Sequence, residues 1–266
     1  MPRPAATVMV VRADVAALEV LMLRRSLASK FVSGAYVFPG GALDPEDADP
    51  SLFDRCTGRT DTEASALLEI ERDGLAYWVS AFRECFEESG VLLAHGPDGA
   101  ALSFGNPSTA ARFEEHRGAL NAGARSFLDI CVAEDLTLPA DALYYVGHWI
   151  TPVGPPRRYD TRFFAALAPA EQVAGHDEVE TIGHMWIAPS EALAQHEAGE
   201  IDMLFPTVWN LRLLARYSSP AELVASVSSL GAVPTFEPEV ALDVHGRQWP
   251  TASPAPPDAV EGGDGG

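Results

Sequence analysis

Three carboxylates at helical spacing are the residues of this chain best arranged for chemistry. Glu84, Glu87 and Glu88 stand at i, i+3 and i+4, so a helix over this stretch places them on one face. Phe82 and Phe86 fall on the opposite face, which predicts a buried side. Like charges at this spacing destabilise an isolated helix by roughly 0.2–0.5 kcal/mol per pair. A bound cation would offset that repulsion, and oxygen-only ligands favour hard ions such as Mg²⁺ or Mn²⁺.

The neighbours of these acids decide between two interpretations. Acids on a helix are usually a solvated face, and that is the plainer interpretation. However, Arg83 lies four residues before Glu87 and is predicted to orient it through a charge-assisted pair. Upstream, residues 38–46 read F-P-G-G-A-L-D-P-E, a strand that runs into a glycine-rich turn, with Glu46 at the sixth position after Gly40. These neighbours favour a functional site.

Together these residues resemble the Nudix box, G-x5-E-x7-R-E-U-x-E-E-x-G-U, in which U is aliphatic. Its fixed positions are filled by Gly40, Glu46, Arg83, Glu84, Glu87, Glu88, Gly90 and Val91. The resemblance implies an α/β (α+β) Nudix fold, with a mixed β-sheet sandwiched between helices. It also implies a hydrolase that uses Mg²⁺ or Mn²⁺ to cleave a nucleoside diphosphate linked to another moiety. Its candidate metal ligands are Glu84, Glu87, Glu88 and the carbonyl of Gly40, and Arg83 joins the three acids in the catalytic set.

One departure from the box is large, because residues 47–82 separate Glu46 from Arg83. Lengthening a loop to this extent costs only about 1.5 kcal/mol in closure entropy, so the insertion is compatible with the fold. It leaves the role of Glu46 open. The pattern is similar to a long-insert branch of the Nudix hydrolases, some of which cleave coenzyme A and its thioesters. Coenzyme A or an acyl-coenzyme A is therefore the preferred substrate. The alternatives are ADP-ribose or another nucleotide-sugar or dinucleotide, and a non-catalytic regulator that senses a nucleotide.

Patterning along the chain predicts the elements that position the acids. Alternation and β-rich composition predict a hairpin from strands at 7–12 and 18–24. Further strands are expected at 146–150, in the second half of 157–167 and at 181–187. Helices are expected at 61–72, 75–89, 108–120, 125–134, 141–145, 189–199, 204–217 and 220–230. We interpret 1–236 as a single domain with helical insertions at about 47–82 and 95–145. Residues 237–266 are expected to form a tail, disordered at least over 251–266.

Basic residues supply candidates for substrate binding. Arg25 lies in a stretch that loosely resembles an upstream motif of coenzyme A-cleaving Nudix enzymes, in which Lys30 replaces an arginine; an edge strand with protective charges is the alternative. Arg158, Tyr159 and Arg162 form the densest basic cluster, in which the arginines suit phosphate and the tyrosine suits a base. The alternative is a surface hairpin whose arginines pair with local acids.

An acid after the box often serves Nudix enzymes as general base or extra metal ligand. The resemblance therefore makes Glu178 and Glu180 candidates for either role.

Composition narrows the choice of partners. The 266 residues carry 38 acids against 18 lysines and arginines, a formal charge of −20, which argues against a nucleic-acid or anionic-membrane surface. A small-molecule diphosphate is the expected partner, and family analogy allows a homodimer. Three widely spaced cysteines, no apolar run of membrane-spanning length and no signal-peptide pattern lead us to expect a cytoplasmic protein.

Overall fold

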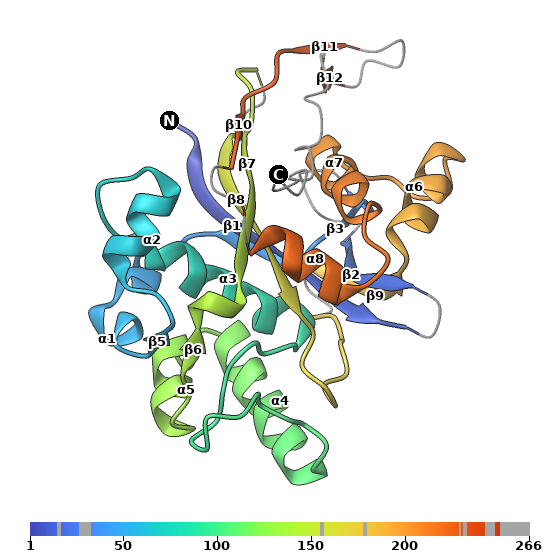
Figure 1. Cartoon of the computed structure of the whole chain (residues 1–266). Helices are drawn as coiled ribbons and strands as arrows, with labels where there is room; N and C mark the ends of the chain where they lie inside the picture. Colours follow the sequence, from blue (N-terminus) through green and yellow to red (C-terminus); the bar gives the residue numbers. More distant parts are fainter. Residues whose placement is uncertain are drawn as a thin grey trace, which may run out of the picture.

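The computed structural model describes residues 1–14, 17–26, 33–154, 157–177, 180–228, 230, 233–242 and 248–250. Glu178, Lys30 and the terminal stretch 251–266, which the sequence singled out, lie outside the described residues. The described chain forms the predicted mixed sheet between layers of helices (Figure 1).

The sheet is built around strand β1, which is both parallel and antiparallel to its neighbours. Its strand order is β10-β7-β8-β1-β2-β3, with β4 also paired to β1 and β9 to β2. β1 runs parallel to β8 and antiparallel to β2, which confirms the predicted hairpin. The strands are β1 (Arg3–Ala13), β2 (Leu18–Arg25), β3 (Tyr36–Val37), β4 (Gly40–Ala42), β7 (Tyr144–Ile150), β8 (Tyr159–Leu167), β9 (Thr181–Ile187) and β10 (Thr235–Phe236).

Side chains of β1 alternate between two hydrophobic cores because successive residues of a strand point to opposite faces. Val8 and Val10 pack into the cluster that contains Trp78 of α3 (Leu75–Ser89). Met9 lies in the other cluster, with residues of α7 (Phe205–Leu214) and α8 (Pro220–Val227). α6 (Pro189–Glu197) contributes Ala192 to this second cluster. Both faces of β1 are therefore buried, as in the three-layer arrangement of Figure 1.

The two predicted insertions pack together on the α3 side of the sheet. The first holds η1 (Pro45–Ala48), α1 (Pro50–Phe53), β5 (Cys56–Thr57) and α2 (Asp61–Leu68). The second holds α4 (Pro107–Asn121), α5 (Phe127–Ala133), β6 (Leu138–Pro139) and η2 (Ala140–Ala142). β5 and β6 pair in parallel, which joins one insertion to the other. Residues of both belong to the core that covers α3.

Two predicted helices differ from the structure. The helix expected to reach Arg72 ends at Leu68, because Glu69 adopts a left-handed conformation with φ of 57° and closes it. The helix expected over 141–145 is wrong: β7 begins at Tyr144, which pairs with Ala165 of β8. Sheet pairing overrides the local preference there. Within the predicted tail, β11 (Val240–Leu242) and β12 (Gln248–Pro250) pair as antiparallel strands.

Candidate active site

Two glycines of β4, Gly40 and Gly41, lie against the acids of helix α3. The N–H of Gly40 donates to Oε2 of Glu88 over 2.9 Å. Gly40 has a φ of 153°, and a Cβ there would lie 2.4 Å from the carbonyl oxygen of Ala6. A Cβ on Gly41 would lie 2.5 Å from the carboxylate of Glu84. Position 40 therefore requires glycine, and a side chain at position 41 would displace the Glu84 carboxylate, so the two glycines let the backbone of β4 approach the acids of α3.

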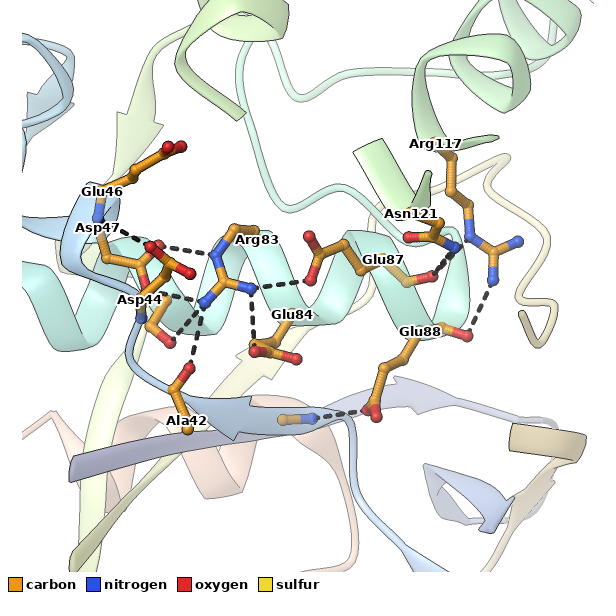
Figure 2. A network of polar contacts seen from close by, with 12 residues as sticks. Ala42, Asp44, Glu46, Asp47, Arg83, Glu84, Glu87, Glu88, Arg117 and Asn121 are labelled. Atoms are coloured by element: carbon orange, nitrogen blue, oxygen red, sulfur yellow. Dashed lines mark hydrogen bonds and ion pairs between the residues drawn. The ribbon is translucent and has the colours of Figure 1, made fainter. Parts of the chain in front are cut away.

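Arg83 is the centre of a charged network on this face of α3 (Figure 2). Its Nη1 donates to Oε1 of Glu84 over 2.9 Å and to Oε2 of Glu87 over 2.8 Å. Its Nε and Nη2 donate to the two oxygens of Asp47 over 2.7 and 2.8 Å, as a bidentate pair. One guanidinium thus orients the carboxylates of three residues. The predicted pair of Arg83 with Glu87 is present.

Asp47, and not Glu46, supplies the acid from the glycine-rich turn. Asp47 is 1% exposed, and besides Arg83 it accepts the N–H of Asp44 over 2.8 Å. The Asp44 side chain in turn caps the short helix η1. Glu46 is exposed, and in Figure 2 its carboxylate points away from Arg83. Counting the box spacing from Gly41 instead of Gly40 reaches Asp47, so the position carries Asp where the pattern has Glu.

The three acids of α3 are held in surroundings that disfavour their charged forms. Burial raises the pKa of Glu84 to about 7, with Glu87 adding to the rise and Arg83 opposing it. Burial likewise raises the pKa of Glu87, which Arg83 again opposes. Burial and the neighbouring Glu84 raise the pKa of Glu88 well above its ordinary value. When all three are ionised, the face carries more negative charge than Arg83 balances.

This donor set fits a hard divalent cation. Within the part of the chain that the structure describes, no group of three or more His, Cys, Asp or Glu side chains forms a complete metal site on its own. Mg²⁺ does not require such a site, because it usually keeps several waters and binds through one or two carboxylates together with substrate phosphates. A divalent cation would relieve the mutual repulsion of Glu84 and Glu88.

Two further predicted residues lie within electrostatic reach of the acids. The positive charge of Arg25, at the end of β2, lowers the pKa of Glu88 against the dominant effect of burial. The negative charge of Glu180 raises the pKa values of Glu87 and Glu88, also in addition to burial. Because the N–H of Ser26 donates to the carbonyl of Glu180 over 2.8 Å, the ends of β2 and of the loop before β9 meet here. Glu178, the other candidate acid, lies outside the described residues.

The second basic cluster is engaged elsewhere. Arg162 is 4% exposed, pairs with Asp160 and lies over the ring of Tyr77. Arg158 donates to the carbonyl of Thr151 and pairs with Glu237. The pair of Arg162 with Asp160 joins residues close in sequence, as the alternative interpretation expects, whereas Glu237 is distant in sequence from Arg158. The neighbouring Tyr159 is half-buried, and its N–H donates to the hydroxyl of Thr151.

Sequence reasoning missed two residues at this site. Asp47 was missed because the box spacing was counted from Gly40 instead of Gly41, and because the box pattern has a glutamate at this position. Arg117, on α4, donates to backbone carbonyls at the end of α3. No spacing in the sequence signals this contact, because it joins two helices through tertiary packing.

A mixed sheet between helices, with a glycine-rich turn facing an R-E-x-x-E-E helix, defines the Nudix class. A family model described as the NUDT19 Nudix domain matches residues 59–214, and the chain belongs to this family. The chain is 30% identical over 240 residues to the human acyl-coenzyme A diphosphatase NUDT19, covering 76% of this chain and 62% of that protein. It is 28% identical over 239 residues to the protein of the same name from Gallus gallus, covering 77% and 63%.

These coverages mean that the chain spans less than two thirds of the length of either relative. Among solved structures, the chain is similar to a NUDIX hydrolase from Alicyclobacillus acidocaldarius, with a TM-score of 0.65 and 26% identity over 88% of this chain and 99% of that one. This similarity confirms the predicted fold class. Nudix enzymes typically depend on a divalent metal. Among the described residues, no helix is long and apolar enough to cross a membrane.

Proposed function

We propose that this chain is a divalent-metal-dependent diphosphatase that cleaves coenzyme A or an acyl-coenzyme A. The observation that carries the proposal is the excess of buried and partly buried carboxylates on α3. Glu84, Glu87 and Glu88 share one face with a single arginine, and the pKa of each is raised, first by burial. The substrate class is drawn from the relatives, which are named acyl-coenzyme A diphosphatases.

Each residue of the network has a role in the proposed reaction. Glu84 and Glu88 would hold Mg²⁺ or Mn²⁺, with Glu87 and the carbonyl of Gly40 completing the ligand set. When bound, such an ion polarises a phosphoryl oxygen and lowers the pKa of a water for in-line attack. Arg83 orients Glu84 and Glu87, and Asp47 fixes Arg83 in turn. Glu180 is the described candidate for general base or additional ligand, because its charge acts on both Glu87 and Glu88.

Arg25 is the preferred phosphate-binding arginine of this proposal. Its positive charge lowers the pKa of Glu88. This effect is smaller than those of burial, Glu84, the Gly40 N–H and Glu180 on the same pKa. Guanidinium groups bind phosphate oxygens in a bidentate manner. A local cation of this kind would let an anionic diphosphate enter a protein of formal charge −20. We assign substrate contact to Arg25 ahead of Arg158, Tyr159 and Arg162.

We also propose that residues 1–236 act as one domain. The two insertions pack into the same core as α3 and β1. β5 and β6 pair across them. On this arrangement the insertions support the catalytic helix and do not form a separate unit.

A substrate panel tests the function directly. Coenzyme A, acetyl-coenzyme A, ADP-ribose, NADH and diadenosine polyphosphates would be incubated with the enzyme and Mn²⁺. We expect 3′,5′-ADP together with a phosphopantetheine product from the coenzyme A substrates. Faster turnover of ADP-ribose or a dinucleotide would overturn the substrate assignment. Tight nucleotide binding without any turnover would favour the sensing regulator instead.

A further inference from the structure

The last turn of α3 carries Glu87 and Glu88, and its backbone carbonyls need partners. The last four carbonyls of an α-helix have no partner within the helix unless a cap supplies one. Gly90, in the left-handed conformation with φ of 72°, donates its N–H to the carbonyl of Phe86 over 2.9 Å. The N–H of Gly175 donates to the carbonyl of Ser89 over 2.7 Å. The carbonyls of the two acids themselves remain to be satisfied.

One side chain satisfies both of them. Arg117 donates from Nε to the carbonyl of Glu87 and from Nη2 to the carbonyl of Glu88, each over 2.9 Å (Figure 2). Asn121, one turn further along α4, adds a longer contact of 3.3 Å to the carbonyl of Glu87. The side chain of Arg117 is 7% exposed, and its closest carboxylate, that of Glu114, is 3.7 Å away. Arg117 is thus committed to the end of α3.

Chemistry favours arginine for this contact. Its planar fork presents donors at a fixed spacing, so one group can bind two successive carbonyls, whereas a lysine ammonium offers a single point of charge. A cation at a helix C-terminus also interacts favourably with the helix dipole, and more strongly where it is partly buried. Hydrogen bonds from a charged donor are also stronger than those between neutral groups. Together these effects hold the last turn of α3 against fraying.

The opposite end of α3 is held in a related way. The Asp61 carboxylate of α2 accepts the N–H of Leu75 over 2.9 Å and that of Asp73 over 3.1 Å. The first insertion therefore caps the beginning of α3, and the second insertion caps its end. The acids lie on a helix that both insertions hold in register.

We propose that Arg117 is a positioning residue for the box acids: by binding the carbonyls of Glu87 and Glu88 it fixes where their carboxylates lie. The inference rests on the proposed function, because the acids must serve catalysis for their placement to matter. Reacting groups must be held close to the productive geometry, and a displacement of about 1 Å can reduce activity on the order of 100-fold. Arg117 acts through the backbone of α3 and makes no contact with the carboxylates.

Three variants test this role. Arg117→Met removes both bonds and keeps an unbranched side chain, and Arg117→Lys keeps the charge but loses the fork. Arg112→Gln is the matched control, because Arg112 lies on the same helix but pairs with Glu134, the C-cap residue of α5, and 49% of its side chain is exposed. Hydrogen exchange of a peptide spanning 83–91 reports the last turn of α3 directly. Mn²⁺ affinity and steady-state kinetics report the site.

We expect exchange in this peptide to quicken by at least about tenfold in Arg117→Met, as a locally frayed turn would give. We expect kcat to fall by roughly 10–100-fold, with KM changed by less than about threefold and Mn²⁺ affinity weakened. Arg117→Lys should lie between Arg117→Met and wild type, and Arg112→Gln should match wild type in all three measurements. Unchanged exchange in both Arg117 variants would overturn the proposal, as would losses no larger than those of Arg112→Gln.

If Arg117→Met does not fold, Arg117→Lys serves as the test, because it retains the charge at the helix end.

Two outcomes separate this inference from the proposed function. If the wild-type protein neither binds Mn²⁺ nor hydrolyses a diphosphate, the proposed function fails, and the catalytic role of Arg117 fails with it. If wild type is active but Arg117→Lys and Arg117→Met keep wild-type exchange and kcat, only the positioning role is wrong.

Discussion

Two arginines, the partly buried Arg83 and the buried Arg162, lie in charged networks of opposite balance. Arg83 contacts the carboxylates of three residues, and Glu88 lies just beyond them. At the other network, the Asp160 carboxylate accepts from Nε2 of His148 over 2.6 Å and from the guanidinium of Arg162. His148 is fixed in turn by Thr235, which lies 2.7 Å from its Nδ1. The first network has acids in excess, whereas the second has one acid with two partners.

The pKa values express the same difference. Burial acts on both networks and raises the pKa of a carboxyl group in each. At α3 burial prevails, and the pKa of Glu84 rises to about 7. On β8 the hydrogen bond from His148 and the charge of Arg162 overcome burial, and the pKa of Asp160 falls below its ordinary value. The balanced network around Asp160 links β7 to β8. The acids of α3 are not balanced in this way, so a bound cation would stabilise their ionised forms.

The largest expected effect is on hydrolysis by Glu88→Gln. Removing this charge from the unbalanced network should reduce metal-dependent turnover by at least about 100-fold, equal to about 2.7 kcal/mol in the activation free energy. The amide oxygen can still accept the N–H of Gly40, so the fold should persist. Asp160→Asn is the matched change in the balanced network, and its kcat should stay within about threefold of wild type. Equal losses in both variants would erase the distinction.

Arg162→Met should act on stability and not on substrate binding. It leaves the half-buried Asp160 with His148 alone, so we expect a loss of about 2 kcal/mol in the free energy of unfolding, measured by urea denaturation. KM for the diphosphate substrate should be unchanged. A raised KM at wild-type stability would restore the substrate role that the sequence suggested for Arg162.

Asp47→Asn tests how far the unbalanced network depends on its most buried acid. Loss of the bidentate pair should free Arg83 and reduce kcat by roughly tenfold, or about 1.4 kcal/mol. Glu46→Gln, at the exposed neighbouring position, should leave kcat as it is. Were Glu46→Gln to give the larger loss, the assignment of the turn acid to Asp47 would be wrong.

The last expected effect is a pH dependence of stability in the metal-free protein. Because the pKa of Glu84 is raised from 4.5 to about 7, the folded state binds this proton more tightly than the unfolded state. Its stabilising contribution is complete below about pH 4.5 and is lost as the pH rises through about 7. Relative to Glu84→Gln, wild type should lose on the order of 2–3 kcal/mol between pH 5 and 8.

Thermal melts in a chelator across this pH range make the measurement. Added Mn²⁺ should reverse the trend, because the metal binds the ionised carboxylates. A wild-type melting temperature that rises with pH relative to that of Glu84→Gln would contradict the predicted direction.

What the sequence predicts well here is local. The placement of the acids and of Arg83 follows from helical periodicity alone, and the hairpin of β1 and β2 follows from alternation. The partners of the charged side chains cannot be predicted from this periodicity, because they lie in segments far apart in the sequence. Arg162 meets the carbonyl of Leu68, and His148 meets Thr235, which only the folded sheet reveals. The contact of Arg117 could not be predicted for the same reason. Its partners are backbone carbonyls, which every residue has, so no residue type in the sequence indicates them.

Anomalous diffraction from crystals soaked in Mn²⁺ would locate a divalent cation bound by the acids of α3. We expect a peak within ligand distance of the carboxylates of Glu84 and Glu88, and no such peak in crystals of Glu88→Gln. If a protein that hydrolyses its substrate shows no peak at these carboxylates, the acids of α3 do not bind the catalytic cation.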